Sequence, residues 1–270
     1  MLYQAKNGTV ELEKGRMDYL RFGTGGKIMI LLPGLGEALQ SIRGMALPMA
    51  FGYREFTKDF TVYMFGRREP LTMGETTADM AEDLARAMEK LGITQADVVG
   101  VSMGGMIAQH LAIRHPEKVG KLVLAVTCGK ANETVAACME TWLDCARRGD
   151  HTALMDSNVK LIYSEDYYRK NKVLVPLMGK LTKPKSYDRF FIQAQACLTH
   201  DAAAQLNRIT VPTLVLGGGK DRVVGSEAAQ ALAGAIPGAV LKVYPQWGHG
   251  LYEEEKSFNR TVREFLLAEE

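Results

Sequence analysis

The sequence predicts an α/β fold in which a mostly parallel, doubly wound sheet carries a helical insertion. Short apolar runs bounded by turn residues alternate with amphipathic helical segments in the first and last parts of the chain. Between these two parts, the pattern of residues 130–199 is helical, with no convincing strand. The chain has 270 residues, which is enough to bury a large core without a metal or a disulfide.

Most of the apolar runs are continuous, which is typical of parallel strands that helices cover on both faces. Met17 to Phe22 alternates instead and is predicted to belong to an antiparallel hairpin near the N-terminus. The predicted parallel strands are Ile28 to Leu32, Thr61 to Phe65, Val98 to Val101, Leu122 to Val126, Thr213 to Leu216 and Val240 to Tyr244.

Helix boundaries can be predicted at several points between the strands. Thr76 and Asp79 resemble a capping box at the start of a helix, and Gly92 ends that helix. A later helix is predicted to open at Ser226. The last helix is indicated by apolar residues at helical spacing, namely Phe258, Val262, Phe265 and Leu266.

Residues 130–199 are predicted to form a helical cap, with residues 1–129 and 200–270 forming the core. Several helices in a row are too long for a single crossover between strands, so a cap is favoured over ordinary long helices packed on the sheet. Pro176 and Pro184 are expected to interrupt the helices.

Composition excludes several classes of function. Lys and Arg total 33 against 31 acidic residues, so no basic face for nucleic acid is expected. The longest apolar runs are too short to span a bilayer, and the first residues lack the apolar region of a signal peptide. We therefore expect a cytoplasmic protein with no membrane partner, no metal and no cofactor. The cysteines, expected to be reduced thiols, are Cys128, Cys138, Cys145 and Cys197.

The segment Gly100-Val101-Ser102-Met103-Gly104 carries the most informative pattern. It follows an apolar run and opens a helix that Pro116 ends. A serine between two glycines fits a tight strand-to-helix turn, because glycine relieves the crowding around a strained backbone. Such a turn pushes the hydroxyl outward, so Ser102 is the candidate nucleophile. The alternative is a glycine-rich turn whose serine has no function.

A serine hydroxyl needs a base to remove its proton, and the chain has five histidines. His249 lies between two glycines just beyond the strand that ends at Tyr244, at the edge where open α/β sheets place their sites. His249 is therefore the candidate base, and a loop histidine without function is the alternative. The others lie on the helix after Ser102, in the insertion or at its end: His110, His115, His151 and His200.

Asp221 is the candidate acid that orients the histidine, because it follows the strand Thr213 to Leu216. A developing oxyanion also needs N–H donors. The N–H of Met103 at the helix start is one candidate, and the N–H of Leu35, in a glycine-containing loop that leaves an early strand at the same edge, is the other. A plain turn is the alternative for that loop. The aspartates judged less suitable are Asp166, Asp188 and Asp201.

Over nearly its whole length the chain resembles the α/β-hydrolase superfamily, specifically the capped, cofactor-free serine hydrolases of the carboxylesterase and enol-lactonase type. The resemblance implies the fold, a triad of Ser102, Asp221 and His249 in that chain order, and oxyanion N–H groups at Leu35 and Met103. The segments that carry it are Thr77 to Leu84, Gly100 to Gln109, Arg114 to Val119 and Val211 to Leu216.

Two departures from the family pattern stand out. Members often have His-Gly where this chain has Pro33-Gly34, and the loop after the fourth strand usually reads Asp-x-Arg-Gly-x-Gly, whereas here it is Gly66-Arg67-Arg68-Glu69-Pro70-Leu71. The nucleophile position is serine, whereas dehalogenase and epoxide-hydrolase relatives carry aspartate.

The sequence predicts a hydrolase that cleaves a small-molecule, ester-like bond through an acyl-enzyme. The alternatives are a lactonase, a carbon–carbon bond hydrolase, a thioesterase, a cofactor-free haloperoxidase or a small-molecule receptor without catalysis. The oligomeric state stays open. The cap is expected to supply apolar walls over the site, with Met139, Trp142, Tyr163, Phe190 and Phe191 as candidates.

Overall fold

The centre of the computed structural model, which describes residues 2–269, is an eight-stranded sheet in the order β1-β2-β4-β3-β5-β6-β7-β8. The first two strands form an antiparallel hairpin, β2 runs antiparallel to β4, and the remaining neighbours are parallel. The strands are β1 (Lys6–Leu12), β2 (Gly15–Phe22), β3 (Lys27–Leu32), β4 (Phe60–Phe65), β5 (Ala96–Val101), β6 (Val119–Ala125), β7 (Thr213–Gly218) and β8 (Val240–Tyr244).

The predicted hairpin and parallel strands are therefore confirmed. β8 differs in one respect, because Val240, Leu241 and Val243 are exposed although the run is apolar. β8 is the last strand of the sheet and pairs only with β7 among the described residues, so its apolar sequence does not mean burial on both faces.

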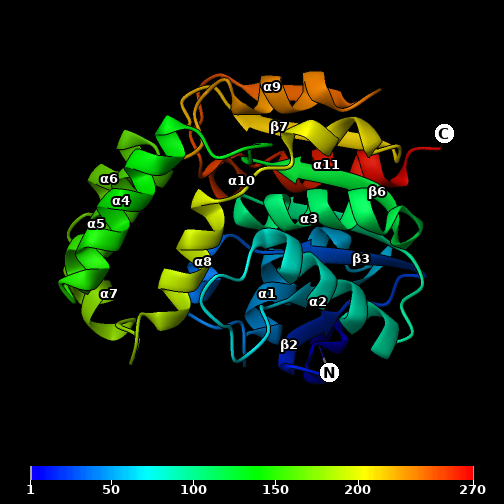
Figure 1. Ribbon diagram of the computed structural model, residues 1–270, viewed down its shortest axis with the longest axis horizontal. Coiled ribbons are helices and arrows are strands. Elements are labelled where there is room, and N and C mark those ends of the chain that lie inside the picture. Colours follow the sequence, from blue (N-terminus) through cyan, green and yellow to red (C-terminus); the bar gives the residue numbers. More distant parts are fainter. Residues whose placement is uncertain (1, 270) are drawn as a thin grey trace.

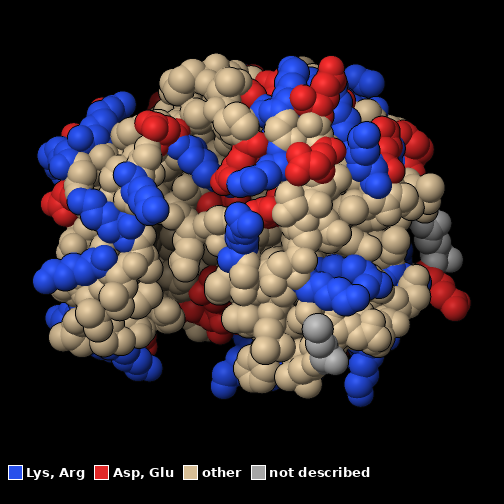
Figure 2. Space-filling model, turned by 90° about the horizontal axis from the view of Figure 1, so that it is seen from below, with Lys and Arg blue, Asp and Glu red and all other residues tan. Residues whose placement is uncertain are grey.

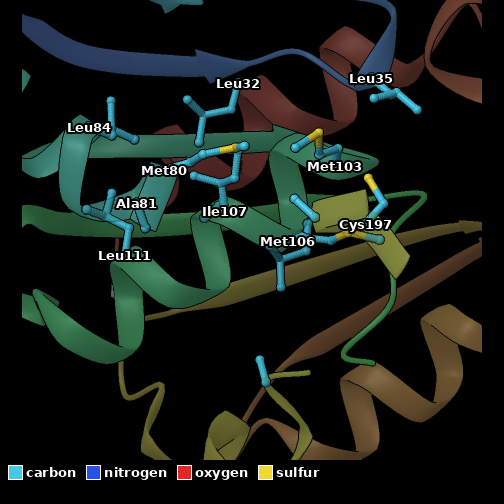
Figure 3. Packing of buried hydrophobic residues seen from close by; sticks show 14 of the residues in the cluster. Leu32, Leu35, Met80, Ala81, Leu84, Met103, Met106, Ile107, Leu111 and Cys197 are labelled. Atoms are coloured by element: carbon cyan, nitrogen blue, oxygen red, sulfur yellow. The ribbon is translucent and has the colours of Figure 1, made fainter. Parts of the chain in front are cut away.

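Helices cover both faces of the sheet (Figure 1). On one face, α2 (Thr77–Lys90), α3 (Met103–Arg114) and α9 (Ala228–Ala235) pack on alternate strand residues such as Ile30 and Val98. On the other face, α1 (Ala46–Gly52) and α11 (Phe258–Leu267) pack on the intervening residues, among them Met29 and Val99. Figure 3 shows Met80, Ala81 and Leu84 of α2 beside Ile107 and Leu111 of α3.

Local sequence signals set the helix ends. The Thr76 side chain accepts from the Asp79 N–H, and the Asp79 carboxylate accepts from the Thr76 N–H, so the predicted capping box is present. Gly92, with φ of 69°, follows the end of the same helix. The helix predicted to open at Ser226 instead begins at Ala228, with Glu227 as its N-cap and no side-chain cap.

Helices α4 to α8 form the insertion lobe between β6 and β7, and no strand of the sheet lies within it. In Figure 1 this lobe stands to one side of the sheet. Pro176 does not interrupt a helix as expected, because it lies in the first turn of α7, where proline costs no hydrogen bond. The helices are α4 (Glu133–Arg147), α5 (His151–Ile162), α6 (Glu165–Asn171), α7 (Val175–Leu181) and α8 (Asp188–Leu198).

Two further observations concern the described residues as a whole. None of the helices within 2–269 has the length and apolarity needed to cross a membrane. The cysteines are all free and buried.

Candidate active site

Ser102 lies at a sharp turn between β5 and α3, with φ of 54° and ψ of −121°. Positive φ is uncommon for a residue with a side chain, and the surrounding packing holds it here. A Cβ on Gly104 would lie 2.0 Å from the Leu32 carbonyl oxygen, and one on Gly100 would lie 2.6 Å from the Gly104 carbonyl oxygen. The two glycines that flank Ser102 in the sequence motif are therefore required by close backbone contact.

A continuous chain of hydrogen bonds joins Ser102, His249 and Asp221. The Ser102 Oγ lies 2.9 Å from His249 Nε2, and His249 Nδ1 lies 2.8 Å from Asp221 Oδ2. The other carboxylate oxygen, Oδ1, accepts from the N–H groups of Val223 and Val224 at 2.8 and 3.0 Å. These backbone bonds fix the carboxylate, and the carboxylate in turn fixes the imidazole.

Each of these residues is positioned by the C-terminal end of a parallel strand. Ser102 directly follows β5, Asp221 follows β7, and His249 lies in the loop after β8. Both His249 and Asp221 are buried, at 3% and 6% exposure, so water does not compete for their hydrogen bond. A buried imidazole between a carboxylate and a hydroxyl is able to accept the hydroxyl proton while the carboxylate stabilises the resulting charge.

The two predicted oxyanion donors both begin helices. Leu35 is the first residue of the 3-10 helix Leu35–Ala38, and Met103 is the first residue of α3. The N–H groups of a first turn have no acceptor inside their own helix, so both are available to a ligand. The loop that carries Leu35 lies against the serine, because a Cβ on Gly34 would lie 3.3 Å from the Ser102 Cβ.

A buried charged cluster that sequence reasoning missed supports this loop. The Arg67 side chain donates from Nη2 to the Pro33 carbonyl oxygen at 2.6 Å, and the Arg67 N–H lies 3.3 Å from Glu37 Oε1. Gln193 of α8 donates to Glu37 Oε2 at 3.2 Å, and Arg189 of α8 forms an ion pair with Glu37. The insertion lobe and the loop after β3 are thus linked through one buried carboxylate.

Burial shifts the pKa of Arg67 in this cluster. The Arg67 side chain is only 4% exposed, and burial lowers its pKa from the ordinary arginine value, although the Glu37 carboxylate opposes that shift. The sequence signal was the pair Arg67 and Arg68, which follows the buried strand β4 after Gly66, since a charge in that place needs a buried partner; the sequence does not say which partner.

A cavity of about 650 Å³ opens beside Ser102 and His249, between the core and the insertion lobe. Three of the predicted pocket residues, Trp142, Tyr163 and Phe190, line it. The prediction was wrong for Met139 and Phe191, which do not line the cavity: Met139 lies in the buried core cluster and Phe191 packs against it. Phe190 and Phe191 are adjacent on α8, and neighbouring helix residues face directions about 100° apart.

Among the described histidines, only His249 is hydrogen-bonded to the Ser102 hydroxyl, although His151 also lines the cavity. His200 Nδ1 lies 2.9 Å from the Thr77 Oγ1, and the His200 ring packs edge-on against His110 with ring centroids 5.2 Å apart. Burial lowers the pKa of His110 to about 4 and that of His200 to about 3. His115 pairs with Glu82, and His151 lies 3.2 Å from the Thr182 hydroxyl.

The model of one protein family, described as the alpha/beta hydrolase fold, matches residues 27–256. The chain belongs to the α/β hydrolase family. The expected resemblance is therefore confirmed, and so is the fold. Relatives named as hydrolases agree that this α/β hydrolase is an enzyme of the hydrolase class.

Two curated relatives and one solved structure illustrate the range of the family. The 2-hydroxymuconate semialdehyde hydrolase of Pseudomonas putida is 31% identical over 211 residues, covering 75% of this chain and 73% of the relative. RutD of Caulobacter sp. (strain K31), whose name proposes a carbamate hydrolase, is 28% identical over 202 residues, covering 74% and 75%. The enol-lactonase of Burkholderia xenovorans LB400 superposes with a TM-score of 0.81 at 22% identity, covering 97% and 100%.

Proposed function

We propose that this α/β hydrolase is a serine hydrolase that cleaves a carboxylic ester-type bond of a small molecule through an acyl-enzyme. The observation that carries the proposal is the hydrogen-bonded chain from Asp221 through His249 to the Ser102 hydroxyl. A serine in a strained turn, next to a buried imidazole and a cavity, is the constellation that acyl transfer requires.

In the proposed reaction, the Ser102 oxygen attacks the acyl carbon while His249 Nε2 takes the hydroxyl proton. The N–H groups of Leu35 and Met103 hydrogen-bond to the oxyanion of the tetrahedral intermediate. His249 then gives its proton to the leaving alcohol oxygen, and the carbon–oxygen bond breaks. A water molecule repeats the sequence on the acyl-enzyme, losing its proton to His249, and releases the acid.

The helices α4 to α8 are proposed to act as a cap that closes over the acyl or alcohol group. Support comes from Trp142, Tyr163 and Phe190, which line the cavity together with Ser102. Several methionines, among them Met45, Met49, Met155 and Met178, line the same space. Their flexible side chains favour an apolar substrate whose shape the cavity adapts to.

Hydrolysis of a carbon–carbon bond is the second candidate, because the relative with 31% identity is named as a semialdehyde hydrolase. The same three residues would serve in both reactions, but the leaving group would be a carbanion instead of an alcohol. A substrate panel therefore separates the two better than any variant of the three residues.

A fluorophosphonate probe tests the proposal directly, since it reacts with an activated serine. We expect the probe to label the protein once, at Ser102, and to leave Ser102→Ala unlabelled. A panel of esters, thioesters and lactones of graded chain length then identifies the bond. An unlabelled wild-type protein that turns over none of the panel would instead favour a small-molecule receptor.

A further inference from the structure

The helix α7 exposes apolar side chains that nothing else in the described chain covers. Val173 and Leu181 are 77% and 73% exposed, and Leu174, Leu177 and Met178 are also exposed. We call these five residues the α7 patch. The opposite side of the helix is fixed to the lobe, because a Cβ on Gly179 would lie 2.9 Å from the Thr152 Cα of α5 and Val175 is buried. The patch therefore cannot turn inward without dismantling the lobe.

The segment around the patch carries only positive charge. Residues 167–187 contain six basic side chains and no acidic one. The five lysines among them form no ion pair within residues 2–269, and all are exposed: Lys170, Lys172, Lys180, Lys183 and Lys185. Figure 2 shows the lobe, on its left, with uncharged surface between basic side chains and a hollow beside it.

The patch lies at the cavity that contains Ser102. Leu174 and Met178 expose part of their surface outward and also line that cavity, together with Val175 between them. On the core side, α1 behaves similarly. Met45 and Met49 line the cavity, whereas Leu47 and Phe51 are exposed. Apolar surface thus borders the cavity on both the lobe and the core.

A second copy of the chain is a poor occupant for the patch. A twofold dimer centred on the patch would bring two sets of six basic side chains together. An anionic lipid surface complements both the positive charge and the apolar side chains of this segment. Its head groups attract lysine, and its acyl region accepts leucine, valine and methionine.

We propose that the α7 patch and its lysines dock the enzyme on an anionic lipid surface. This docking differs from the expectation, made from the sequence, that the protein has no membrane partner. It is peripheral and needs no membrane-spanning helix, so it agrees with the finding that no helix within residues 2–269 is long and apolar enough to cross a membrane. With the patch on the lipid, the cavity that leads to Ser102 opens at the lipid interface. This inference rests on the proposed function, and it makes the substrate an ester of an apolar acyl chain that partitions into a membrane.

Vesicle flotation tests the docking, using the Ser102→Ala protein so that no substrate is consumed. We expect binding to vesicles of phosphatidylcholine mixed with phosphatidylglycerol, weak binding to phosphatidylcholine alone, and loss of binding as salt is raised. The variant Lys170→Gln/Lys172→Gln/Lys180→Gln is expected to lower partitioning roughly a hundredfold. The variant Val173→Ser/Leu177→Ser/Leu181→Ser is expected to abolish binding to both.

A matched control is Lys27→Gln/Lys58→Gln/Lys90→Gln, which removes three exposed lysines near the opposite edge of the sheet and should bind as the parent does. Equal binding by the patch variants and the control would overturn the proposal. So would a dimer that the Val173→Ser/Leu177→Ser/Leu181→Ser variant turns into a monomer in sedimentation, because the patch would then be a contact between copies. Fluorophosphonate labelling of Ser102 in each patch variant, made with the serine intact, separates failure of docking from failure of the proposed chemistry.

Discussion

The Arg67 guanidinium donates to the Pro33 carbonyl oxygen at 2.6 Å and so ties the loop after β4 to the loop that carries Leu35. Pro33 itself offers this loop neither a hydrogen-bonding side chain nor a backbone N–H. Arg67 supplies a hydrogen bond to the loop from the segment that follows the neighbouring strand β4. The support that Pro33 cannot give to its own loop thus comes from Arg67, in the loop after β4 that also departs from the family pattern.

The first prediction concerns Arg67 as a positioning residue. Arg67→Met removes the bond to Pro33, so the N–H of Leu35 loses its fixed direction. Loss of a single oxyanion donor costs about 10²–10³ in kcat, and we expect a loss of roughly 10- to 100-fold here because the loop is displaced but still present. KM should change little. Arg86→Met, at an exposed arginine of α2, is the matched control, and an unchanged kcat in Arg67→Met would refute the role.

Replacing the serine gives the second prediction. Ser102→Ala should lower kcat by about 10⁴-fold or more, since neither the imidazole nor the N–H groups can replace the nucleophile. Ser226→Ala, at an exposed serine before α9, should keep full activity. Steady-state kinetics with the best substrate of the panel decide the matter. Near-normal turnover by Ser102→Ala would remove the serine from the reaction.

The third prediction separates two functions of the Asp221 carboxylate: it accepts from the backbone N–H groups of its own loop, and it orients His249. In Asp221→Asn, the amide oxygen can still accept from the Val223 and Val224 N–H groups, so the loop should stay folded. The amide NH₂ would then face His249 Nδ1 and hold the imidazole in the tautomer that cannot accept the serine proton. We expect kcat to fall about 10⁴-fold with little change in melting temperature. Asp201→Asn, which loses only an exposed ion pair with Lys130, is the control. A Asp221→Asn protein that unfolds would show that the charge itself is structural.

Glycine substitutions give the fourth prediction, for stability. Gly104→Ala would place a Cβ 2.0 Å from the Leu32 carbonyl oxygen, and the backbone of β3 has no room to yield, so we expect a loss of about 1–3 kcal/mol or more. Gly234→Ala lies inside α9 with nothing within 4 Å of its Cβ and should gain about 0.4–1 kcal/mol. Urea denaturation measures the free energy of unfolding of both variants. If the two variants changed it equally, the turn at Ser102 would have relaxed to accommodate the added Cβ.

Features that depend on neighbouring residues in the chain could be predicted from the sequence. Ser102, Asp221 and His249 each follow an apolar strand, so a rule about strand ends in parallel sheets was enough to select them from the serines, aspartates and histidines of the chain. The capping box at Thr76 is also local, since both partners lie within one turn.

The charged cluster around Glu37 could not be predicted from the sequence. Glu37, Arg67 and Arg189 come from three segments, and each taken alone is an ordinary charged residue. Only the fold brings them together and excludes water from them. The prediction that Met139 and Phe191 line the cavity was wrong for a similar reason. Helical spacing shows which residues share a face of a helix, but not whether that face contacts a cavity or the core.

The last prediction concerns pH and the buried pair His110 and His200. Their pKa values in the folded protein are about 4 and about 3, against about 6.5 in the unfolded chain. Between these values the unfolded chain binds more protons than the folded one, so the free energy of unfolding must fall as the pH falls. The decline should begin near pH 6.5 and reach about 1.4 kcal/mol per pH unit for each histidine.

His200→Gln tests this assignment, because glutamine keeps a hydrogen-bonding group near Thr77 but does not titrate. Urea denaturation from about pH 7.5 to about pH 5 should show a shallower decline for the variant than for the wild type, with the two curves parallel above about pH 7. This range lies above the titration of the carboxylates with lowered pKa values, such as Asp79 and Glu82, so they do not mask the difference. An identical decline in the variant would mean that His200 gains its proton without unfolding, and that the space around its ring is less closed than its 2% exposure implies.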